Sequence, residues 1–188
     1  MFQVYHADCL IKLQDLPDCS VDSVVTDPPS GMGFLSHDWD KDKGGRDLWI
    51  LWMSQIAAEC LRIIKPGGFA LVWAIPKTSH WTAMAWENGG WEVRDRVSHL
   101  FGQGRPSSSN SLKPACEDWW LLRKAPIGTV TQNELKYGTG AMNMAASKIG
   151  DQGRWPTQIM LDEYIADLLD QQSGVLKSGM MKAGQLRK

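Results

Sequence analysis

The stretch that decides the fold reads VDSVVTDPP and covers residues 21–29. Its β-branched residues favour a strand, and its two prolines end that strand because neither can donate a backbone hydrogen bond. Residues 47–64, DLWILWMSQIAAECLRII, then show helical periodicity, and KPGG at 65–68 is typical of a helix end. The apolar run FALVWAI at 69–75 has the length of a strand buried on both faces. This strand–helix–strand order predicts an α/β fold with a mostly parallel sheet.

Weaker patterns extend this arrangement in both directions. Residues from 126 onward lose periodicity and are expected to be irregular, with a short strand or helix at 157–170. The other expected elements are strands at 2–6, 91–101 and 117–125, helices at 8–16 and 78–88, and loops at 30–46 and 102–114. We therefore divide the chain into residues 1–125 and a second segment, 126–188, with a basic tail.

Composition excludes several classes of protein. The chain has 188 residues, 43% hydrophobic and 22% charged, which suits one soluble domain rather than a disordered or disulfide-dense chain. No apolar run approaches the roughly 20 residues of a membrane helix, and no signal peptide is visible. We therefore expect a cytoplasmic protein that does not associate with a membrane. The four cysteines are scattered and predict reduced, mostly buried thiols, with no metal site.

Charge and tryptophan content give weaker hints. The net charge of −1 argues against a nucleic-acid binder, although residues 61–124 carry nine basic and five acidic side chains. Chance variation along a surface explains that imbalance equally well. The ten tryptophans could be core residues or stacking surfaces for nucleobases.

The sharpest local signal is Asp27-Pro28-Pro29-Ser30, directly after a hydrophobic strand. A carboxylate stands beside carbonyl acceptors there, and the prolines remove competing N–H donors. Such a site suits a ligand that presents an amino group. The alternative is a plain strand terminator.

Six longer stretches around this tetrapeptide carry a resemblance. They are ADCLIKLQDLPDCSVDSVVTDPPSGMGF (7–34), HDWDKD (37–42), LRIIKPGGFALVW (61–73), FGQGRPSSSNSLKPACEDWWLLRK (101–124), GTVTQNELKYGTGAMNM (128–144) and GRWPTQIMLDE (153–163). In this order they resemble the amino-methylating DNA methyltransferases, which form N6-methyladenine or N4-methylcytosine and carry a D-P-P-Y type signature. The similarity is greatest to the adenine-specific branch from phages and prophages.

The resemblance implies a partial Rossmann-like sheet and chemistry that uses S-adenosyl-L-methionine. Asp27, Pro28, Pro29 and Ser30 would form the catalytic signature. Asp27 and the Pro28 carbonyl would accept the two hydrogens of the amino group of a base flipped out of DNA. Asp8 matches an acidic position near the cofactor's adenosine, so Asp8 and Asp27 are the candidate cofactor residues. A helix N-cap for residues 9–16 is the other interpretation of Asp8.

Two departures from the family pattern stand out. Ser30 replaces an aromatic residue that stacks on the flipped base, so Phe34 or Trp39 becomes the candidate substrate-binding ring. An aromatic at position 30 is expected to strengthen binding if the loop accommodates it. The Gly-rich cofactor loop is also missing, since the FGQG at 101–104 precedes a loop rather than a helix.

These departures shape the functional expectation. Residues 1–125 would be the catalytic-motif part of the methyltransferase domain, and 126–188 a variable segment for target recognition. The strand edge beside Asp27 would stay open for a second chain that supplies the cofactor-binding half, or for self-association. The expected activity is site-specific DNA adenine-N6 methylation of the restriction–modification or phage type, in a bacterial host or phage-infected cell. The alternatives are a remnant that only binds DNA or a partner, and a cytosine-N4 methyltransferase, in which Ser more often stands where Asp27 does.

Overall fold

The computed structural model describes residues 2–102, 104–106, 108–151 and 153–174. These residues form two compact units. The first unit runs from the N-terminus to His99 and from Cys116 to Met160. The second unit comprises Leu100–Ala115 and the described residues from Leu161 onward.

A five-stranded sheet has the order β1-β2-β4-β3-β5. The strands are β1 (Val21–Thr26), β2 (Ile64–Ala74), β3 (Glu92–Leu100), β4 (Cys116–Arg123) and β5 (Ile159–Leu161). β1 is parallel to β2, with Thr26 opposite Val72, and β4 is antiparallel to β2, with Asp118 opposite Ala74. The predicted α/β class is confirmed, but the sheet is mixed rather than mostly parallel. No described helix joins β3 to β4, and β4 runs antiparallel to β2.

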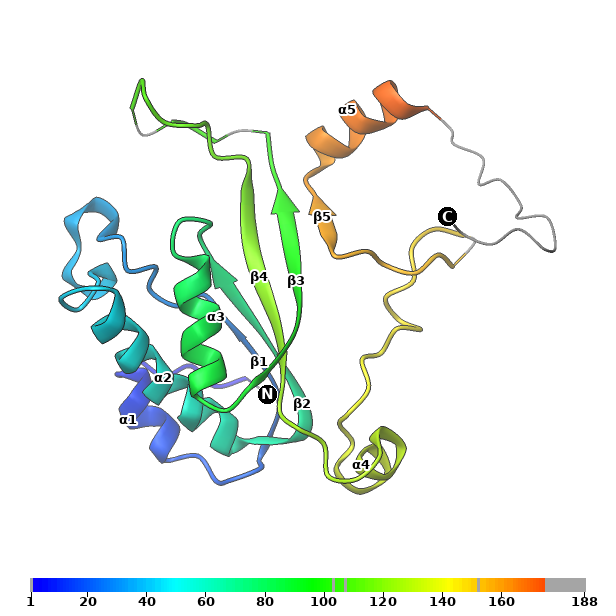
Figure 1. Cartoon of the computed structure of the whole chain (residues 1–188). Coiled ribbons are helices and arrows are strands. Elements are labelled where there is room, and N and C mark those ends of the chain that lie inside the picture. The colour runs from blue at the N-terminus through cyan, green and yellow to red at the C-terminus, as the bar shows by residue number, and fades with distance from the viewer. Residues whose placement is uncertain (1, 103, 107, 152, 175–188) are drawn as a thin grey trace, which may run out of the picture. The chain divides into compact units, whose positions relative to one another are not determined.

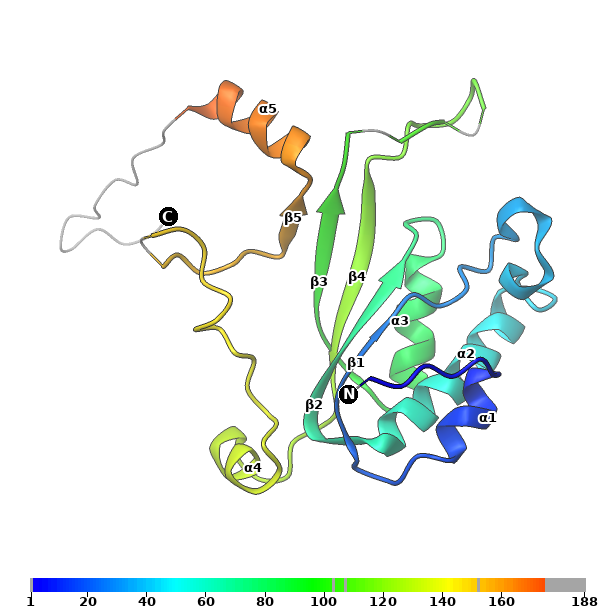
Figure 2. The same ribbon diagram turned by 180° about the vertical axis from the view of Figure 1, so that it is seen from behind.

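Three helices of the first unit gather on one face of this sheet (Figure 1). They are α1 (Cys9–Gln14), α2 (Arg46–Ile63) and α3 (Ser79–Asn88). Their core with the sheet includes six side chains that are at most 1% exposed, namely Trp49, Met53, Ala57, Val72, Trp86 and Leu122. Seen from behind, no described helix covers β1 and β2 (Figure 2).

Two sequence predictions near β1 and β2 are wrong. Residues 2–6 form no strand, and Phe2 and Val4 remain 89% and 84% exposed, because this segment has no strand to pair with. The strand predicted at 69–75 begins earlier, at Ile64, so α2 ends close to KPGG as predicted but residues 65–68 belong to β2. Gly67 adopts a φ of +75° and the β1–β2 register shifts here, so a bulge takes the extra residues.

A helix also forms where the sequence pattern predicted an irregular segment. α4 (Val130–Tyr137) begins at a capping box in which the Thr129 and Gln132 side chains each accept a hydrogen bond from the other residue's backbone N–H. The fully buried Asn133 amide donates to the Pro66 carbonyl at 2.8 Å and attaches α4 to β2. Tertiary contact therefore stabilises a helix whose periodicity is weak.

The second unit is built around α5 (Glu163–Ser173). Asp162 caps this helix by accepting from the Ile165 N–H at 2.7 Å, and it also accepts from the Gly102 N–H at 3.0 Å. The expected strand or helix at 157–170 is thus both, β5 followed by α5. The basic tail from residue 175 lies outside the described residues.

Two further findings bear on the expected class of protein. None of the described helices has the length and apolar character needed to span a bilayer. The cysteines are free, but only Cys60 is buried, while Cys9 and Cys19 are exposed. The prediction of mostly buried thiols is wrong because α1 and the turn after it lie at the surface.

Candidate active site

The end of β1 places Asp27 at one edge of the sheet. β1 and β2 are parallel, so their last residues lie at the same end of the sheet. Ile75, which follows β2, therefore lies near Asp27. Because β4 is antiparallel to β2, its first residues return there, and Glu117 joins Asp27 and Ile75. Three strand ends that are far apart in the sequence therefore meet at one site.

A cavity of about 410 Å³ opens at this edge, within the roughly 300–1,000 Å³ typical of ligand pockets. It combines carboxylates with aromatic and apolar walls, a lining that suits a planar ligand with an amino group. The lining residues are Asp27, Pro28, Ser30, Met32, Phe34, Trp39, Asp40, Trp73, Ile75 and Glu117. We call this the first cavity.

Asp27 lies in an unfavourable environment for negative charge. Partial burial raises the pKa of its carboxyl group, and the nearby charges of Glu117 and Asp40 raise it further. A carboxyl group held in this way accepts hydrogen bonds well from an amino group, since such donors relieve the repulsion.

A second cavity of about 260 Å³ adjoins the same strand end. It is mostly apolar and is lined by Cys9, Thr26, Asp27, Pro28, Pro29, Trp52, Met53, Ile56, Cys60 and Trp86. Asp27 and Pro28 line both cavities. The indole Nε1 of Trp86 is buried and has no hydrogen-bond partner among the described residues.

The predicted site residues are only partly brought together. Asp27, Pro28, Ser30, Phe34 and Trp39 all line the first cavity, whereas Pro29 lines the second.

Asp8 lines neither cavity. Its carboxylate accepts from the Leu10 and Ile11 N–H groups at 2.9 and 3.3 Å, which confirms the N-cap interpretation. Cys9, the next residue, lines the second cavity.

Sequence reasoning missed two acidic residues of the site. Asp40 is 1% exposed and accepts hydrogen bonds from Ser30, Gly31 and Phe34. Glu117 faces the first cavity and lies 3.5 Å from His99 Nδ1. Glu117 carries no local signal, because only the antiparallel pairing of β4 brings it beside Asp27.

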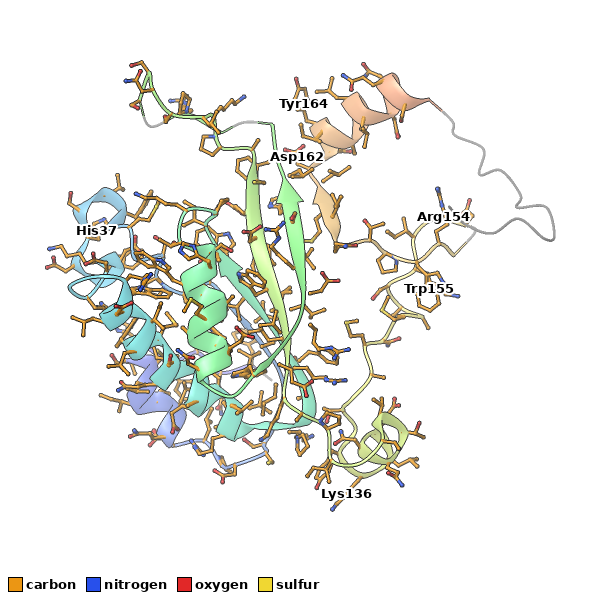
Figure 3. All side chains as sticks on the ribbon, in the orientation of Figure 1. His37, Lys136, Arg154, Trp155, Asp162 and Tyr164 are labelled. Carbon is orange, nitrogen blue, oxygen red and sulfur yellow. The ribbon has the colours of Figure 1, made fainter. Side chains whose placement is uncertain are left out.

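A cationic and aromatic hairpin lies elsewhere in the first unit, on the segment between α4 and β5 (Figure 3). Ile149 and Arg154 pair as an isolated antiparallel bridge. The Lys148 ammonium lies 5.7 Å from the centre of the Trp155 ring, which is 66% exposed.

This chain is similar to curated DNA methyltransferases in sequence and to solved ones in fold. It is 32% identical over 75 residues to the type II methyltransferase M.BamHI of Bacillus amyloliquefaciens, covering 40% of this chain and 18% of that protein. It is 35% identical over 65 residues to the DNA adenine methyltransferase YhdJ of Escherichia coli, covering 35% of this chain and 22% of that protein. The chain thus spans about a fifth of these curated relatives. The cytosine-N4-specific PvuII DNA methyltransferase has a similar fold, with a TM-score of 0.57 at 15% identity over 95% of this chain and 64% of that one.

A second solved structure, the M1.HpyAVI–SAM complex, also shares the fold, with a TM-score of 0.52 and 15% identity over 90% of this chain and 73% of that one. A family model for DNA methylases of the N6/N4 type matches residues 21–175. This match includes the strand end at Asp27, all residues that line the first cavity, and α4. The chain belongs to this DNA methylase family.

Proposed function

We propose that this chain forms the base-binding and catalytic half of a site-specific DNA adenine-N6 methyltransferase. The observation that carries the proposal is that Asp27 and Pro28 line both cavities. An amino group bound in the first cavity and a methyl donor bound in the second would meet at this residue pair. Such convergence suits a transfer between two ligands held in neighbouring cavities at one strand end.

The chemistry explains why acceptors are needed at this point. The amino nitrogen of adenine is a poor nucleophile because its lone pair is delocalised into the ring. The Asp27 carboxylate and the Pro28 carbonyl would accept its two hydrogens and direct the lone pair out of the ring plane. S-adenosyl-L-methionine supplies, when bound, the electrophilic methyl group. A base in a duplex cannot reach the first cavity, so it would have to be flipped out.

The second cavity fits part of this cofactor. Its apolar walls and the Asp27 carboxylate suit a ligand that combines a flat ring with polar groups. Asp8 lines neither cavity, but Cys9 beside it lines the second, and both N-cap hydrogen bonds go to Asp8 Oδ1. We therefore propose Asp8 Oδ2 as a further cofactor contact. At about 260 Å³, however, the cavity is smaller than typical ligand pockets. The described residues thus supply one wall of the cofactor site.

A further polypeptide would supply the other wall. β1 forms the edge of the sheet, and Val25 on it is 71% exposed. An unpaired, apolar strand edge is a ready site for another strand. We infer that a second chain carrying a Gly-rich cofactor-binding half pairs there, and self-association through the same edge is the alternative.

The flipped base would stack on an aromatic ring of the first cavity. Trp39 is 57% exposed and Phe34 is 59% exposed, and both line this cavity with Asp27. Stacking on such rings contributes about 1–3 kcal/mol per base. These rings would replace the aromatic residue that Ser30 lacks.

The segment 126–188 would contact the duplex around the target. Its hairpin presents Lys148 and Arg154 beside the exposed Trp155 ring, a combination that suits phosphates and bases. These side chains support a target-recognition role for the segment.

Methyl transfer by a reconstituted assembly tests the proposal. The chain is combined with a polypeptide that carries the Gly-rich half of a related enzyme, and tritiated methyl incorporation into DNA is measured. Asp27→Ala should lower transfer by about 100-fold or more, as loss of a preorganised transition-state contact does.

The matched control is Asp22→Ala on the same strand, where the carboxylate is exposed and paired with Lys65 at 2.5 Å. This control should leave transfer unchanged. Transfer by Asp27→Ala within about threefold of wild type, a loss below about 0.7 kcal/mol, would contradict the role of Asp27. That outcome would favour a chain that only binds DNA or a partner.

A further inference from the structure

The loop after the strand end folds around one buried carboxylate. Asp40 accepts from the Ser30 hydroxyl at 3.0 and 2.8 Å, from the Gly31 N–H at 3.3 Å and from the Phe34 N–H at 2.7 Å. It also accepts a short hydrogen bond from the Ser30 N–H, and its own carbonyl accepts from the Gly33 N–H at 2.8 Å. Asp40 thus organises every residue of the loop from 30 to 34 except Met32.

These hydrogen bonds explain how a charge survives at 1% exposure. A buried carboxylate is costly unless its oxygens are satisfied. Among the described residues, no Lys or Arg lies within ion-pair distance of Asp40, so backbone N–H groups and one hydroxyl stabilise it instead. Such an arrangement depends on one loop conformation, because each donor must point at the same carboxylate.

Ser30 is committed to this arrangement. Its hydroxyl bonds both Asp40 oxygens, and its carbonyl accepts from the Thr78 hydroxyl at 2.7 Å, which ties the loop to the start of α3. A ring at position 30 would lose the hydroxyl contact. The serine that departs from the family signature is therefore part of a carboxylate-centred loop.

One candidate stacking ring belongs to a residue bonded to this carboxylate, and the other belongs to its neighbour in the chain. Phe34 donates its N–H to Asp40, and Trp39 is the residue directly before it. Trp39 also stacks on the His37 ring, with centroids 6.0 Å apart and planes 17° apart. Loss of the Asp40 contacts would release both rings from the wall of the first cavity.

We propose that Asp40 is the positioning residue of the first cavity, where its contacts with Ser30, Gly31 and Phe34 set Trp39 and Phe34 as the walls on which the target base stacks. This inference rests on the proposed function, since it requires that the first cavity takes a base. Asp40 lines this cavity, but its carboxylate oxygens are bonded to the loop, so it acts through the rings.

A fluorescent base measures this stacking on the intact 188-residue chain. The probe is a single-stranded oligodeoxynucleotide with one 2-aminopurine flanked by abasic residues, so that only a protein ring can stack on the base. Affinity is measured by anisotropy, and stacking by quenching of the probe. Wild type should quench the probe, and Trp39→Ala should weaken binding by about 5- to 150-fold, the range expected for loss of one stacking contact.

Asp40→Asn should weaken binding and quenching to a similar extent. Its amide NH2 group would face the Ser30 hydroxyl and the backbone N–H groups, which are themselves hydrogen-bond donors. Ser30→Ala, which keeps the charge and the backbone contacts, should give a smaller loss in the same direction. The matched control is Asp38→Asn, an acidic residue of the same 3-10 turn whose side chain is 89% exposed and paired with Lys41. It should bind and quench like wild type.

A double-mutant cycle separates positioning from general destabilisation. If Asp40 acts through Trp39, Asp40→Asn should cost little further affinity in a Trp39→Ala background. Additive losses, or wild-type quenching by Asp40→Asn, would overturn the inference. If Asp40→Asn melts below the assay temperature, Ser30→Ala decides, and its unchanged quenching would overturn the inference as well. If wild type does not quench the probe, the first cavity takes no base and the proposed function fails together with the inference.

Discussion

At the scale of single residues, Asp27 must carry a negative charge to accept hydrogens from an amino group. Its pKa is raised by partial burial, and by Glu117 and Asp40. Transfer should therefore fall as the pH drops through this raised pKa, and the fall should begin at a higher pH than for an ordinary aspartate.

Glu117→Gln should lower the pH at which methyl transfer begins to fall, because it removes one of the negative charges that raise the Asp27 pKa. Carboxyl NMR titration of Asp27 in the isolated chain measures the shift without any partner, and Asp22→Asn, which lies outside the set of charges that raise this pKa, is the control. An Asp27 pKa that stays unchanged or rises in Glu117→Gln would contradict the account of this charge cluster.

Asp40 shows the opposite behaviour. Burial alone raises the pKa of this carboxyl group, but hydrogen bonds from Phe34, Ser30 and Gly31 outweigh it, so the pKa lies below the ordinary value. The folded state thus binds this proton more weakly than the unfolded state. The stabilisation from Asp40 is complete above the ordinary pKa of about 4 and is lost as the pH falls through the lowered one.

Asp40→Asn should accordingly lower the free energy of unfolding at neutral pH, and the difference from wild type should shrink in acid. Urea unfolding at pH 7 and at about pH 3 measures both values. Asp22→Asn, which removes only an exposed pair with Lys65, should change stability by no more than about 1 kcal/mol. An Asp40→Asn difference that is the same at both pH values would contradict an ionised Asp40.

At the scale of elements, the loop between β1 and α2 depends on one glycine. Gly31 has a φ of +75°, and a Cβ there would lie 3.0 Å from Trp49 Nε1 and 3.3 Å from a Trp81 ring carbon. Gly31→Ala should therefore suffer backbone strain of about 1–2 kcal/mol, plus a clash in the core.

Gly138→Ala is the matched control, because Gly138 has a φ of +74° and a Cβ at this position would meet no described atom within 4 Å. It should suffer the backbone strain alone. Thermal unfolding should show Gly31→Ala melting several degrees below Gly138→Ala, at about 2–4 °C per kcal/mol for a chain of this size. Equal melting temperatures would contradict the tight packing of this loop against Trp49.

Local patterns predicted those elements whose residues carry their own signals. β1 combines β-branched residues with a proline stop, and α2 has a long amphipathic repeat, so both were found close to their bounds. β2 was predicted too short, because Gly67 forms a bulge against β1 rather than a break. α4 has a local signal only in its Thr129–Gln132 capping box, and its attachment through Asn133 to Pro66, a distant residue, leaves no pattern in the sequence.

The candidate site was predictable in part for the same reason. Asp27 and Pro28 follow from the strand end alone, and Phe34 and Trp39 follow from the lack of a ring at Ser30. Asp40 could not be found in this way, because a hydrogen bond across ten residues of irregular chain leaves no periodic trace.

At the scale of the whole molecule, the open edge of β1 should govern association. Val25 is 71% exposed on this edge strand, so the isolated chain should self-associate in light scattering unless a partner covers the edge. Val25→Lys should reduce that association while leaving the fold intact. Ser23→Lys on the same strand adds the same charge without removing an apolar side chain, and it should have a smaller effect. A monodisperse wild-type monomer would contradict an available edge.

The proposed division of the cofactor site between two polypeptides predicts weak cofactor binding by this chain alone. The isolated chain should bind S-adenosyl-L-methionine no more tightly than millimolar, because two polar contacts of about 1–3 kcal/mol each must also offset the cost of ordering the ligand. Isothermal titration measures this affinity. Micromolar binding by the chain alone would show that the described residues hold more of the cofactor than one wall.

The central claim is that Asp27 and Pro28 bring a base amino group to the methyl donor. It is tested most directly by mass spectrometry of nucleosides from DNA that has been incubated with S-adenosyl-L-methionine and the chain completed by a Gly-rich half. We predict N6-methyladenine with wild type and with Asp22→Ala, and at least about 100-fold less with Asp27→Ala. N4-methylcytosine as the product would shift the target to cytosine. Methylated nucleosides formed equally well by Asp27→Ala would contradict the claim itself.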